Sequence, residues 1–390
     1  MEVRKLTQEE KFDARLISTF AFHFRMEDPE KEKRESETDL TEDWGAFDDD
    51  GRLMAHVMNF KFLFRQDGQW VPAGGIGSVS TLPEYRERGA IRAIFRELLK
   101  SSYQEGQVLS GLYPFNHAFY RKFGYETVRW RDQYKFPPEM LREYHFSGCA
   151  VLWQPGDPVS EYTALYEKFA SDFNLAIRRD DKRMQDDHVK GEWSKERCFS
   201  YMLYEANKPV AYLTFQDVRK DPAPELAVKD YAWDGSAGFR ALLGFLGRFT
   251  ADYGSISIFL PTCLELASVI HSPSAYDIQQ TGWQNYMVRV VNVEKLLGIL
   301  RKPADCSFTV QVSDPMIPEN NGVWAARNDK VERTETQPDL CVSAQAFGQL
   351  AVGSVSLGEA ILREDVQVKG NFETLSRIFV RKPILIADHY

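Results

Sequence analysis

The sequence has few cysteines, and their spacing indicates neither a metal site nor a disulfide framework. Five cysteines occur among 390 residues: Cys149, Cys198, Cys263, Cys306 and Cys341. Their number is odd, and no two of them stand at the short spacing typical of zinc ligands. We therefore expect buried free thiols, a reducing compartment such as the cytoplasm, and no bound metal.

Long apolar runs are also missing. No run approaches the roughly 20 residues that a membrane-spanning helix requires. The first residues, MEVRKLTQEEKF, lack the apolar core of a secretion signal. We therefore expect a protein without a membrane partner. A chain of this length is nevertheless long enough for two or three domains with a substantial core.

Basic residues are fewer than acidic residues. The chain has 48 lysines and arginines against 57 aspartates and glutamates, which gives a formal net charge of −9. This balance argues against general nucleic-acid binding, whereas it suits a cationic substrate or serves solubility alone. The most densely charged stretch, residues 27–43, is either a solvated helix or loop or a flap whose carboxylates help to hold a polycationic substrate.

The stretch from Gly74 to Arg92, GGIGSVSTLPEYRERGAIR, organises the rest of the chain. An apolar strand up to Leu82 is ended by Pro83, and a turn containing arginines and Gly89 then opens a helix. The first N–H groups of a helix have no partners and its dipole attracts anions, so this turn could bind a phosphorylated ligand. An amphipathic helix follows, then a strand over 108–113 ended by Pro114, then FNHAFYRKFGYE.

These motifs resemble those of the GNAT superfamily of acetyl-CoA-dependent N-acetyltransferases. The resemblance rests on Val79-Ser80-Thr81, on Pro83-x-x-Arg86-x-Arg88-Gly89-x-x-Arg92 and on Phe119-Tyr120-Arg121-Lys122-Phe123-Gly124-Tyr125. With this length, the chain resembles the enhanced-intracellular-survival branch in particular. The resemblance implies acetyl-CoA as co-substrate and no metal, with these cofactor-binding residues: Val79, Ser80, Thr81, Arg86, Glu87, Arg88, Gly89, Ala90, Ile91, Arg92, Phe115 and Asn116.

The element order predicts a mixed α/β fold in three domains. Residues 1–145 are the predicted catalytic GNAT domain, and residues 146–287 repeat the order strand, helix, strand at 225–260. That second copy has Asp234-Gly235-Ser236 in place of the arginine turn, so we expect a degenerate, structural copy. Residues 288–390 predict an α+β domain that resembles sterol carrier protein, either a lipid binder or a structural and assembly domain.

Two tyrosines are the candidate catalytic residues. The resemblance assigns the role of general acid to Tyr120, which could otherwise be a packing tyrosine, and Tyr125 is the more plausible packing residue. His117 suits a base by its pKa, but a place at a helix start is expected for it. The end of the chain, RKPILIADHY, is too apolar for a frayed tail and predicts a docked terminus. By the same resemblance the Tyr390 carboxylate is the general base; alternatively, Tyr390 only closes the last domain.

The sequence departs from the family pattern at three positions. Glu87 stands in the arginine run, Ile91 replaces a small residue, and His389 precedes the end.

The predicted activity is acetyl transfer to an amine of an aminoglycoside, a polyamine or a lysine side chain. The alternative is a lipid- or sterol-binding protein with a vestigial acetyltransferase domain. The resemblance also implies a homohexamer.

Overall fold

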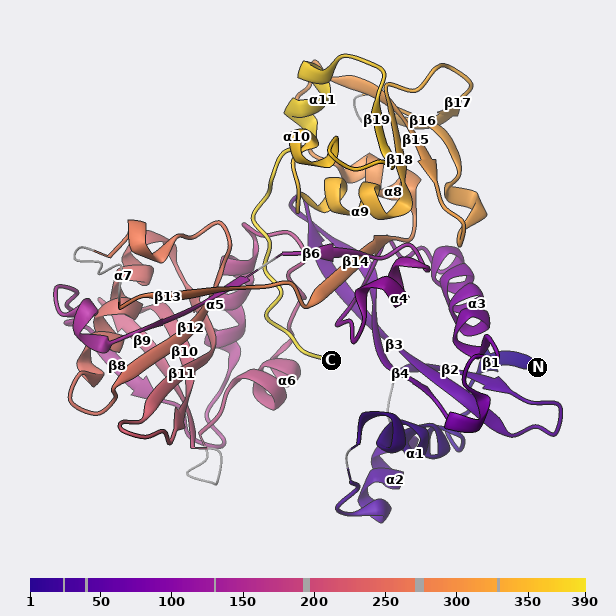
Figure 1. Cartoon of the computed structure of the whole chain (residues 1–390). Coiled ribbons are helices and arrows are strands. Elements are labelled where there is room, and N and C mark those ends of the chain that lie inside the picture. Colours follow the sequence, from indigo (N-terminus) through magenta and orange to yellow (C-terminus); the bar gives the residue numbers. More distant parts are fainter. Residues whose placement is uncertain (24, 39–40, 130, 192–196, 271–276, 328–329) are drawn as a thin grey trace. The chain divides into compact units, whose positions relative to one another are not determined.

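The computed structural model spans residues 1–390 and forms two compact units (Figure 1). The structure describes all residues except 24, 39–40, 130, 192–196, 271–276 and 328–329, and only the backbone of 35–38. Unit 1 contains Met1–Val128, Asn285–Arg381 and Asp388–Tyr390, and unit 2 contains Arg129–Gln284 and Lys382–Ala387. Three segments far apart in the sequence therefore build the unit that holds Gly74–Arg92.

The first sheet of unit 1 has seven strands in the order β1-β2-β3-β4-β5-β14-β6. The pairs from β1 to β4 are antiparallel, β4 and β5 are parallel, and β14 is antiparallel to both β5 and β6. The strands are β1 (Glu2–Lys5), β2 (Glu42–Phe47), β3 (Leu53–Gln66), β4 (Gln69–Thr81), β5 (Leu109–Leu112), β6 (Glu126–Val128) and β14 (Tyr286–Val290).

Helix α3 (Ala90–Gln104) packs against this sheet and provides five buried residues of the core between them. Its apolar residues recur at helical spacing, and Ile94, Phe95, Leu98 and Leu99 are at most 1% exposed. Burial of each such side chain contributes about 1.5–3 kcal/mol. Gly106, with φ of 80°, takes the left-handed conformation that ends the helix. The predicted strand, turn, helix, strand order around Gly74–Arg92 is thus confirmed.

Three shorter helices complete this part: α1 (Lys11–Phe22), α2 (Pro29–Thr38) and α4 (His117–Arg121). The stretch 27–43, predicted as a solvated segment or a flap, contains α2 and the start of β2. Positions 39 and 40 of that stretch lie outside the described residues. Helix α2 packs against α1, and its Glu32 pairs with Arg15 of α1 at 2.9 Å.

The C-terminal module, residues 293–381 of unit 1, has an α+β fold. Its sheet has the order β17-β16-β15-β18-β19, and its helix α9 packs against β14 and β6 of the first sheet (Figure 1). The strands are β15 (Ser307–Ser313), β16 (Gly322–Arg327), β17 (Lys330–Thr334), β18 (Leu340–Ser343) and β19 (Val366–Val368). The helices are α8 (Val293–Ile299), α9 (Ala344–Val352), α10 (Leu357–Ala360) and α11 (Phe372–Ile378).

Unit 2 repeats the strand arrangement of the first sheet. Its order β8-β9-β10-β11-β12-β7-β13 again has antiparallel pairs, one parallel step between β11 and β12, and two further antiparallel pairs. The strands are β7 (Arg131–Phe136), β8 (Cys149–Leu152), β9 (Cys198–Glu205), β10 (Lys208–Val218), β11 (Glu225–Trp233), β12 (Ser255–Pro261) and β13 (Gln279–Trp283). The helices are α5 (Ser160–Ala170), α6 (Asp181–Arg183) and α7 (Gly235–Leu246).

The boundaries of the compact units differ from the predicted domain boundaries at 145/146 and 287/288. Strand β7 lies before residue 146 but pairs with β12 and β13 of unit 2. Strand β14 follows the unit 2 strands in the chain but pairs with β5 and β6 of unit 1. The sixth strand of each sheet, β14 in unit 1 and β7 in unit 2, is therefore not the strand that follows the fifth one in sequence, because β14 comes after the strands of unit 2 and β7 comes before the other strands of its own unit.

Candidate active site

The backbone of β4 bends at Ser78. His56 of β3 pairs with Ser80 and Met58 pairs with Gly77, so two residues of β4 face one residue of β3, which defines a β-bulge. Ser78 has φ of 48°, unusual for a residue other than glycine. Pairing of β4 with β5 runs from Ala73↔Leu109 to Ile76↔Leu112, while β4 itself continues to Thr81. The two parallel strands thus part just before the bulge, as Pro114 after β5 suggested.

The parted edge of β4 carries the backbone groups of Val79 and Thr81. The N–H of Leu82 donates to the carbonyl of Met54 on β3 at 3.0 Å. Because backbone groups alternate sides along a strand, the N–H groups of Thr81 and Val79 point to the opposite edge, where β5 has ended. The Ser80 side chain is 3% exposed and faces Ser18 of α1 at 3.5 Å. Its place is therefore under α1, away from that edge.

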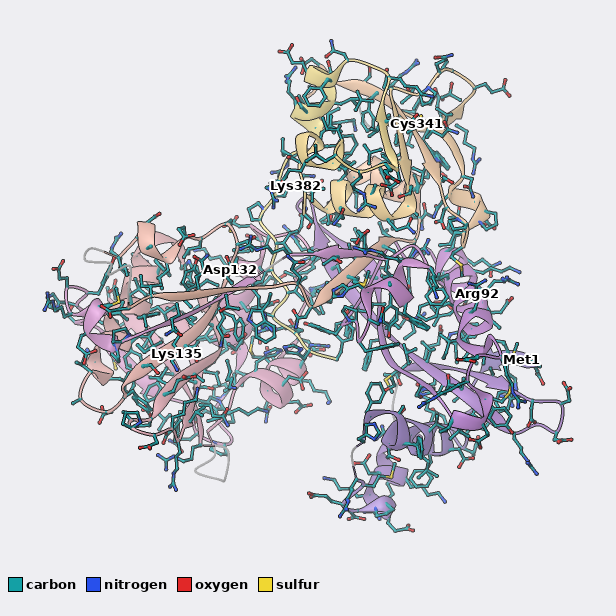
Figure 2. All side chains as sticks on the ribbon, viewed as in Figure 1. Met1, Arg92, Asp132, Lys135, Cys341 and Lys382 are labelled. Carbon is teal, nitrogen blue, oxygen red and sulfur yellow. The ribbon has the colours of Figure 1, made fainter. Side chains whose placement is uncertain are left out.

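The arginine turn leads from the 3-10 helix η1 (Pro83–Tyr85) into α3. Arg86, Glu87, Arg88 and Gly89 are exposed, and Arg92 is exposed in the first turn of α3 (Figure 2). Gly89 caps the helix with φ of 81°, and Glu87 has φ of 63°. The first intrahelical bond runs from Ala93 N–H to Gly89 O at 3.0 Å. The N–H groups before it have no partner within the helix and are suited to an anion.

The remaining residues of the helix start face the core. Ala90 is 3% exposed and Ile91 packs partly buried against the apolar cluster under α3. Glu87 is exposed and offers a carboxylate where the family pattern has a cation. An anion at this turn would therefore be bound by three arginines and the helix N-terminus, beside one like-charged group.

Tyr120 lies on α4 in an aromatic setting. It is 3% exposed, and its ring is 5.3 Å from that of Phe115 and 5.1 Å from that of Phe119. Burial, and to a lesser degree the neighbouring Tyr125, raises the pKa of its phenol above the ordinary value. Its surroundings are thus apolar, not positively charged. Among the described residues, its hydroxyl has no hydrogen-bond partner.

The neighbours of Tyr120 have structural contacts. Asn116 caps α4, because its side-chain oxygen accepts from the N–H of Phe119 at 3.0 Å. Phe115 is 66% exposed. Tyr125 is fully buried and its hydroxyl lies 2.8 Å from Ser110 Oγ, which fits the predicted packing role. His117 begins α4 and is partly exposed, as expected for a residue at a helix start.

The last residue, Tyr390, is docked on the first sheet of unit 1. Its ring lies 4.9 Å from that of Phe62 and 5.5 Å from that of Phe60, both on β3. On β4, a Cβ atom at Gly75 would meet Phe62 Cε2 and would stand 2.6 Å from Tyr390 Cε2, so the absence of a side chain at Gly75 makes room for both rings. A Cβ at Gly77 would stand 3.9 Å from the carboxyl carbon of Tyr390. The carboxyl end of Tyr390 therefore lies beside the bulge of β4.

Two further tyrosines hold this end of the chain. The hydroxyl of Tyr113 donates to the carbonyl of Asp388 at 2.7 Å, and its ring stacks on His389 at 4.7 Å. The hydroxyls of Tyr286 and Tyr390 are 2.7 Å apart. Sequence reasoning missed both residues. The alternating Phe60-x-Phe62-x-Phe64 gave a usable signal for an aromatic strand face, whereas nothing local to Tyr286 indicated its partner.

Neither a metal group nor a membrane helix is found in the part of the chain that the structure describes. No cluster of three His, Cys, Asp or Glu residues there could hold a metal ion. No described helix is long and apolar enough to cross a membrane. The five cysteines are free thiols, but the expectation that they are buried is wrong for all except Cys306.

Comparison with known families identifies two domains. Residues 2–128 match the model of the acetyltransferase (GNAT) domain. The chain carries a GNAT acetyltransferase domain. Residues 293–386 match the sterol carrier protein domain. These matches confirm the predicted enzyme class, an N-acetyltransferase, and the mixed α/β fold with GNAT-like domains and a sterol-carrier-like domain.

Solved structures share the fold of the whole chain. A conserved protein of unknown function from Enterococcus faecalis V583, a probable N-acyltransferase, matches with TM-score 0.87 and 21% identity, over 100% of this chain and 99% of that one. A GCN5-related N-acetyltransferase from Anabaena variabilis matches with TM-score 0.86 and 19% identity over 100% of both chains. Eis1 from Mycobacterium abscessus matches with TM-score 0.83 and 18% identity over 100% of both. No curated protein matches the sequence.

Strand β11 of unit 2 has a bulge, as β4 of the acetyltransferase domain does, but a buried ion pair lies beside it. Its parallel pairing ends at Ala227↔Ser257, and a register shift follows between Val228 and Asp230 of β11. There Asp230 forms a buried ion pair with Arg179 at 2.8 Å. Asp234, at the start of α7, pairs with Lys168 at 2.5 Å. An acidic residue thus stands where the acetyltransferase domain has its arginine turn.

Proposed function

We propose that the protein is an acetyl-CoA-dependent N-acetyltransferase acting on an amine of a cationic acceptor, with Tyr120 as general acid and the Tyr390 carboxylate as general base. One observation carries the proposal: the carboxyl end of Tyr390 lies next to Gly77, at the bulge of β4 in the acetyltransferase domain, where the pairing with β5 has just ended. The two catalytic groups come from distant parts of the sequence and belong to the same compact unit.

The residues present fit acetyl-CoA. Arg86, Arg88 and Arg92, with the N–H groups that open α3, would bind its phosphates. The N–H groups of Val79 and Thr81 would bind the pantetheine chain and the thioester carbonyl, because β5 ends before reaching them. When bound, acetyl-CoA supplies the activated acetyl group. The exposed Glu87 and Phe115 would border the site. Ser80, Ala90 and Ile91 would support it by packing beneath, and Asn116 by capping α4.

The two proton transfers balance the reaction. The amine nitrogen bonds to the acetyl carbon as the carbon–sulfur bond breaks; the amine proton goes to the Tyr390 carboxylate, directly or through water, and the Tyr120 hydroxyl protonates the departing thiolate. A phenol with a pKa near 10 is a weaker acid than a thiol with a pKa near 8.5. Burial raises the pKa of the Tyr120 phenol above that ordinary value, so the proton transfer depends on the departing thiolate being desolvated in the same apolar setting.

The acceptor we propose is polycationic: an aminoglycoside, a polyamine or a lysine side chain. The net charge of −9 and the exposed Glu30 in the first turn of α2 support this class. Full-length fold similarity to Eis1 supports membership of the enhanced-intracellular-survival branch. We further propose a homohexamer and a cytoplasmic location. In this proposal residues 1–145 catalyse, residues 146–287 are a structural copy, and residues 288–390 are the sterol-carrier-like domain.

The proposal is tested by release of free thiol from acetyl-CoA with a panel of aminoglycosides, polyamines and lysine peptides. Thiol release with at least one amine is expected, and Tyr120→Phe should slow it at least a hundredfold if the acid contributes the usual roughly 10²–10⁴-fold. Tyr103→Phe on α3 is the control for loss of a phenol. Binding of lipid without thiol release from any amine would instead support the lipid-binding alternative. The match of residues 293–386 to the sterol carrier protein domain is the observation that favours this alternative.

A further inference from the structure

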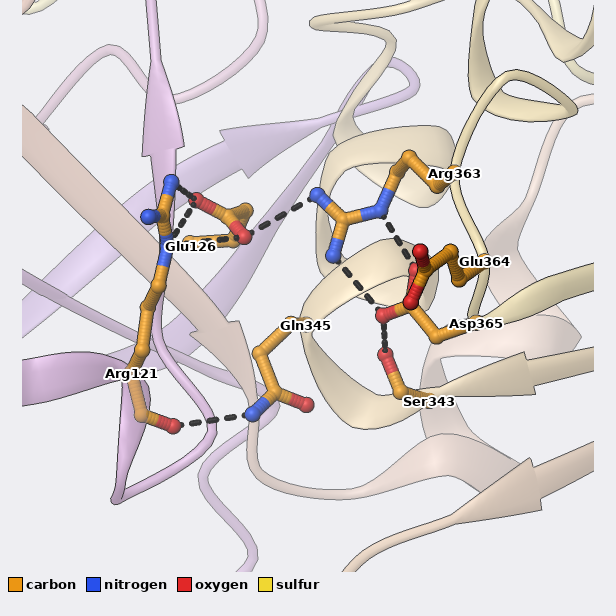
Figure 3. Close-up of a pocket in the computed structure, with 7 residues that line it drawn as sticks. All are labelled: Arg121, Glu126, Ser343, Gln345, Arg363, Glu364 and Asp365. Atoms are coloured by element: carbon orange, nitrogen blue, oxygen red, sulfur yellow. Dashed lines mark hydrogen bonds and ion pairs between the residues drawn. The ribbon is translucent and has the colours of Figure 1, made fainter. Parts of the chain in front are cut away.

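The C-terminal module contacts the segment that follows Tyr120 in the acetyltransferase domain. Two glutamines of α9 reach main-chain carbonyls of this segment. Gln345 Nε2 donates to the carbonyl of Arg121 at 2.8 Å, and Gln349 Nε2 donates to that of Thr127 at 2.7 Å. One face of α9 therefore contacts the end of α4 and strand β6. Figure 3 shows the bond from Gln345 to Arg121.

A buried carboxylate joins the same two parts. Glu126 is 1% exposed, and its carboxylate accepts from Arg121 Nη2 at 2.7 Å and from Arg363 Nη1 at 3.0 Å. Arg363 is itself held by Asp365 through two bonds of 2.8 Å, and Asp365 accepts from the hydroxyl of Ser343 at 2.5 Å. These groups line a pocket of about 520 Å³ (Figure 3). Because every charged group in this chain of contacts has a partner of opposite charge, the network is suited to hold Arg121 and Glu126 in fixed positions.

A second buried pair holds the middle of the segment. Arg289 of β14 donates to the carbonyl of Phe123, and its Nη2 lies 2.6 Å from Asp314 Oδ2. Both side chains are fully buried. Gly124 has φ of 84°, and a Cβ there would stand 2.9 Å from Arg289 Nη1. Asp314 also accepts from the N–H of Met316 at 2.9 Å. The turn after Tyr120 is thus bound to residues outside the acetyltransferase sequence.

We propose that the C-terminal module is a positioning element for the acid. Its Arg363, Gln345 and Gln349 hold residues 121–127, and its Asp314 holds Arg289 of β14 against their turn, so that Tyr120 keeps its place. This assigns positioning residues to the proposed function and rests on it. A displacement of about 1 Å at a catalytic group can cost about a hundredfold in rate. The module would therefore act on kcat through geometry and would leave binding of acetyl-CoA to the arginine turn.

The test compares Arg363→Met with Arg377→Met. Arg377 makes a similar two-bond contact with Asp305, at 3.0 and 3.1 Å, but within the C-terminal module. In Arg363→Met we expect amide hydrogen exchange over residues 117–128 to rise and kcat to fall, each about tenfold, with KM for acetyl-CoA within about twofold. Arg363→Lys, which keeps one bond to Glu126, should lie between. Arg377→Met should match the parent protein in all three measurements.

The exchange measurement separates this inference from the proposed function. If the parent protein transfers no acetyl group, the proposed function fails, while exchange over residues 117–128 still reports whether Arg363 holds the segment. Unchanged exchange in folded Arg363→Met would overturn the inference, as would raised exchange with an unchanged kcat. If Arg363→Met does not fold, Glu126→Gln/Arg363→Met removes both charges and takes its place in the same comparison.

Discussion

The hydroxyl of Tyr286 on β14 lies 2.7 Å from the hydroxyl of Tyr390, the last residue. Tyr286 is fully buried and Tyr390 half-buried, and burial raises the pKa of each phenol above its ordinary value. Both hydroxyls therefore stay protonated and hydrogen-bond as neutral groups. Strand β14 follows unit 2 in the chain, so the acetyltransferase domain holds the proposed base with a residue that lies far outside its own sequence.

Removing this hydrogen bond should loosen the docked end. In Tyr286→Phe the ring and its packing remain, and the lost bond is worth about 0.5–1.5 kcal/mol, so kcat should fall about two- to twelvefold. Steady-state kinetics with saturating acetyl-CoA measures this, with Tyr103→Phe as the control. A Tyr286→Phe enzyme with the parent kcat would mean that the bond does not position Tyr390.

The role of the Tyr390 carboxylate can be separated from that of its ring. Two residues, Gly-Ser, added after Tyr390 convert the carboxylate into a neutral amide beside Gly77, and kcat should fall by about a hundredfold or more. Tyr390→Phe keeps the carboxylate and loses only the bond to Tyr286, so it should resemble Tyr286→Phe. The two are compared by thiol release at equal enzyme concentration. Parent-like activity in the extended protein would refute the assignment of the base.

The local motifs could be predicted from the sequence because they depend on near neighbours. Pro83 and Pro114 mark where two strands end, and Gly89 marks a positive φ at a helix start. The apolar end of the chain correctly predicted that Tyr390 docks. Asn116 caps α4 through its own neighbours, a contact that its side chain and the following helix could have suggested.

The non-local contacts could not be predicted, because they depend on strand pairing across hundreds of residues. No local pattern indicates that β14 inserts between β5 and β6, or that β7 joins the sheet of unit 2. Tyr286, Arg289 and Arg363 owe their contacts to these pairings and to the docking of α9. Their sequence surroundings are those of ordinary strand and turn residues.

The arginine turn should govern affinity for acetyl-CoA. Replacement of Arg86, Arg88 or Arg92 by methionine removes a charge-assisted bond worth about 1.5–3 kcal/mol, so the dissociation constant of CoA should rise about tenfold or more. Arg96→Met, one turn further along α3 and exposed, is the control. Titration calorimetry at low salt measures this. An equal effect of Arg96→Met would indicate attraction by overall charge instead of a defined phosphate site.

The glycine at position 75 should be required for docking of Tyr390. In Gly75→Ala the new Cβ would clash with the ring of Phe62, on which Tyr390 packs, and would stand 2.6 Å from Tyr390 Cε2; such overpacking costs about 1–3 kcal/mol. We expect lower stability in urea unfolding and a lower kcat. Gly298→Ala in α8 is the control, because a Cβ there meets nothing within 4 Å. Gly75→Ala with parent-like stability and activity would show that the ring of Tyr390 has other places to lie.

The buried phenol of Tyr120 gives two pH-dependent predictions with the same sign. Because its pKa is raised in the folded protein, Tyr120 stays protonated there while the unfolded chain ionises near pH 10. Its contribution to stability is thus complete below pH 10 and is lost as pH rises, by at most about 1.4 kcal/mol per pH unit. Urea unfolding between pH 9 and about 11 should therefore show a steeper loss of stability with pH for the parent than for Tyr120→Phe.

The second prediction concerns the rate. The kcat of the parent should not decrease through ionisation of Tyr120 below about pH 10. Equal slopes in the two proteins, or a fall near pH 8 that Tyr120→Phe abolishes, would show that the phenol is solvated and more acidic than its burial implies.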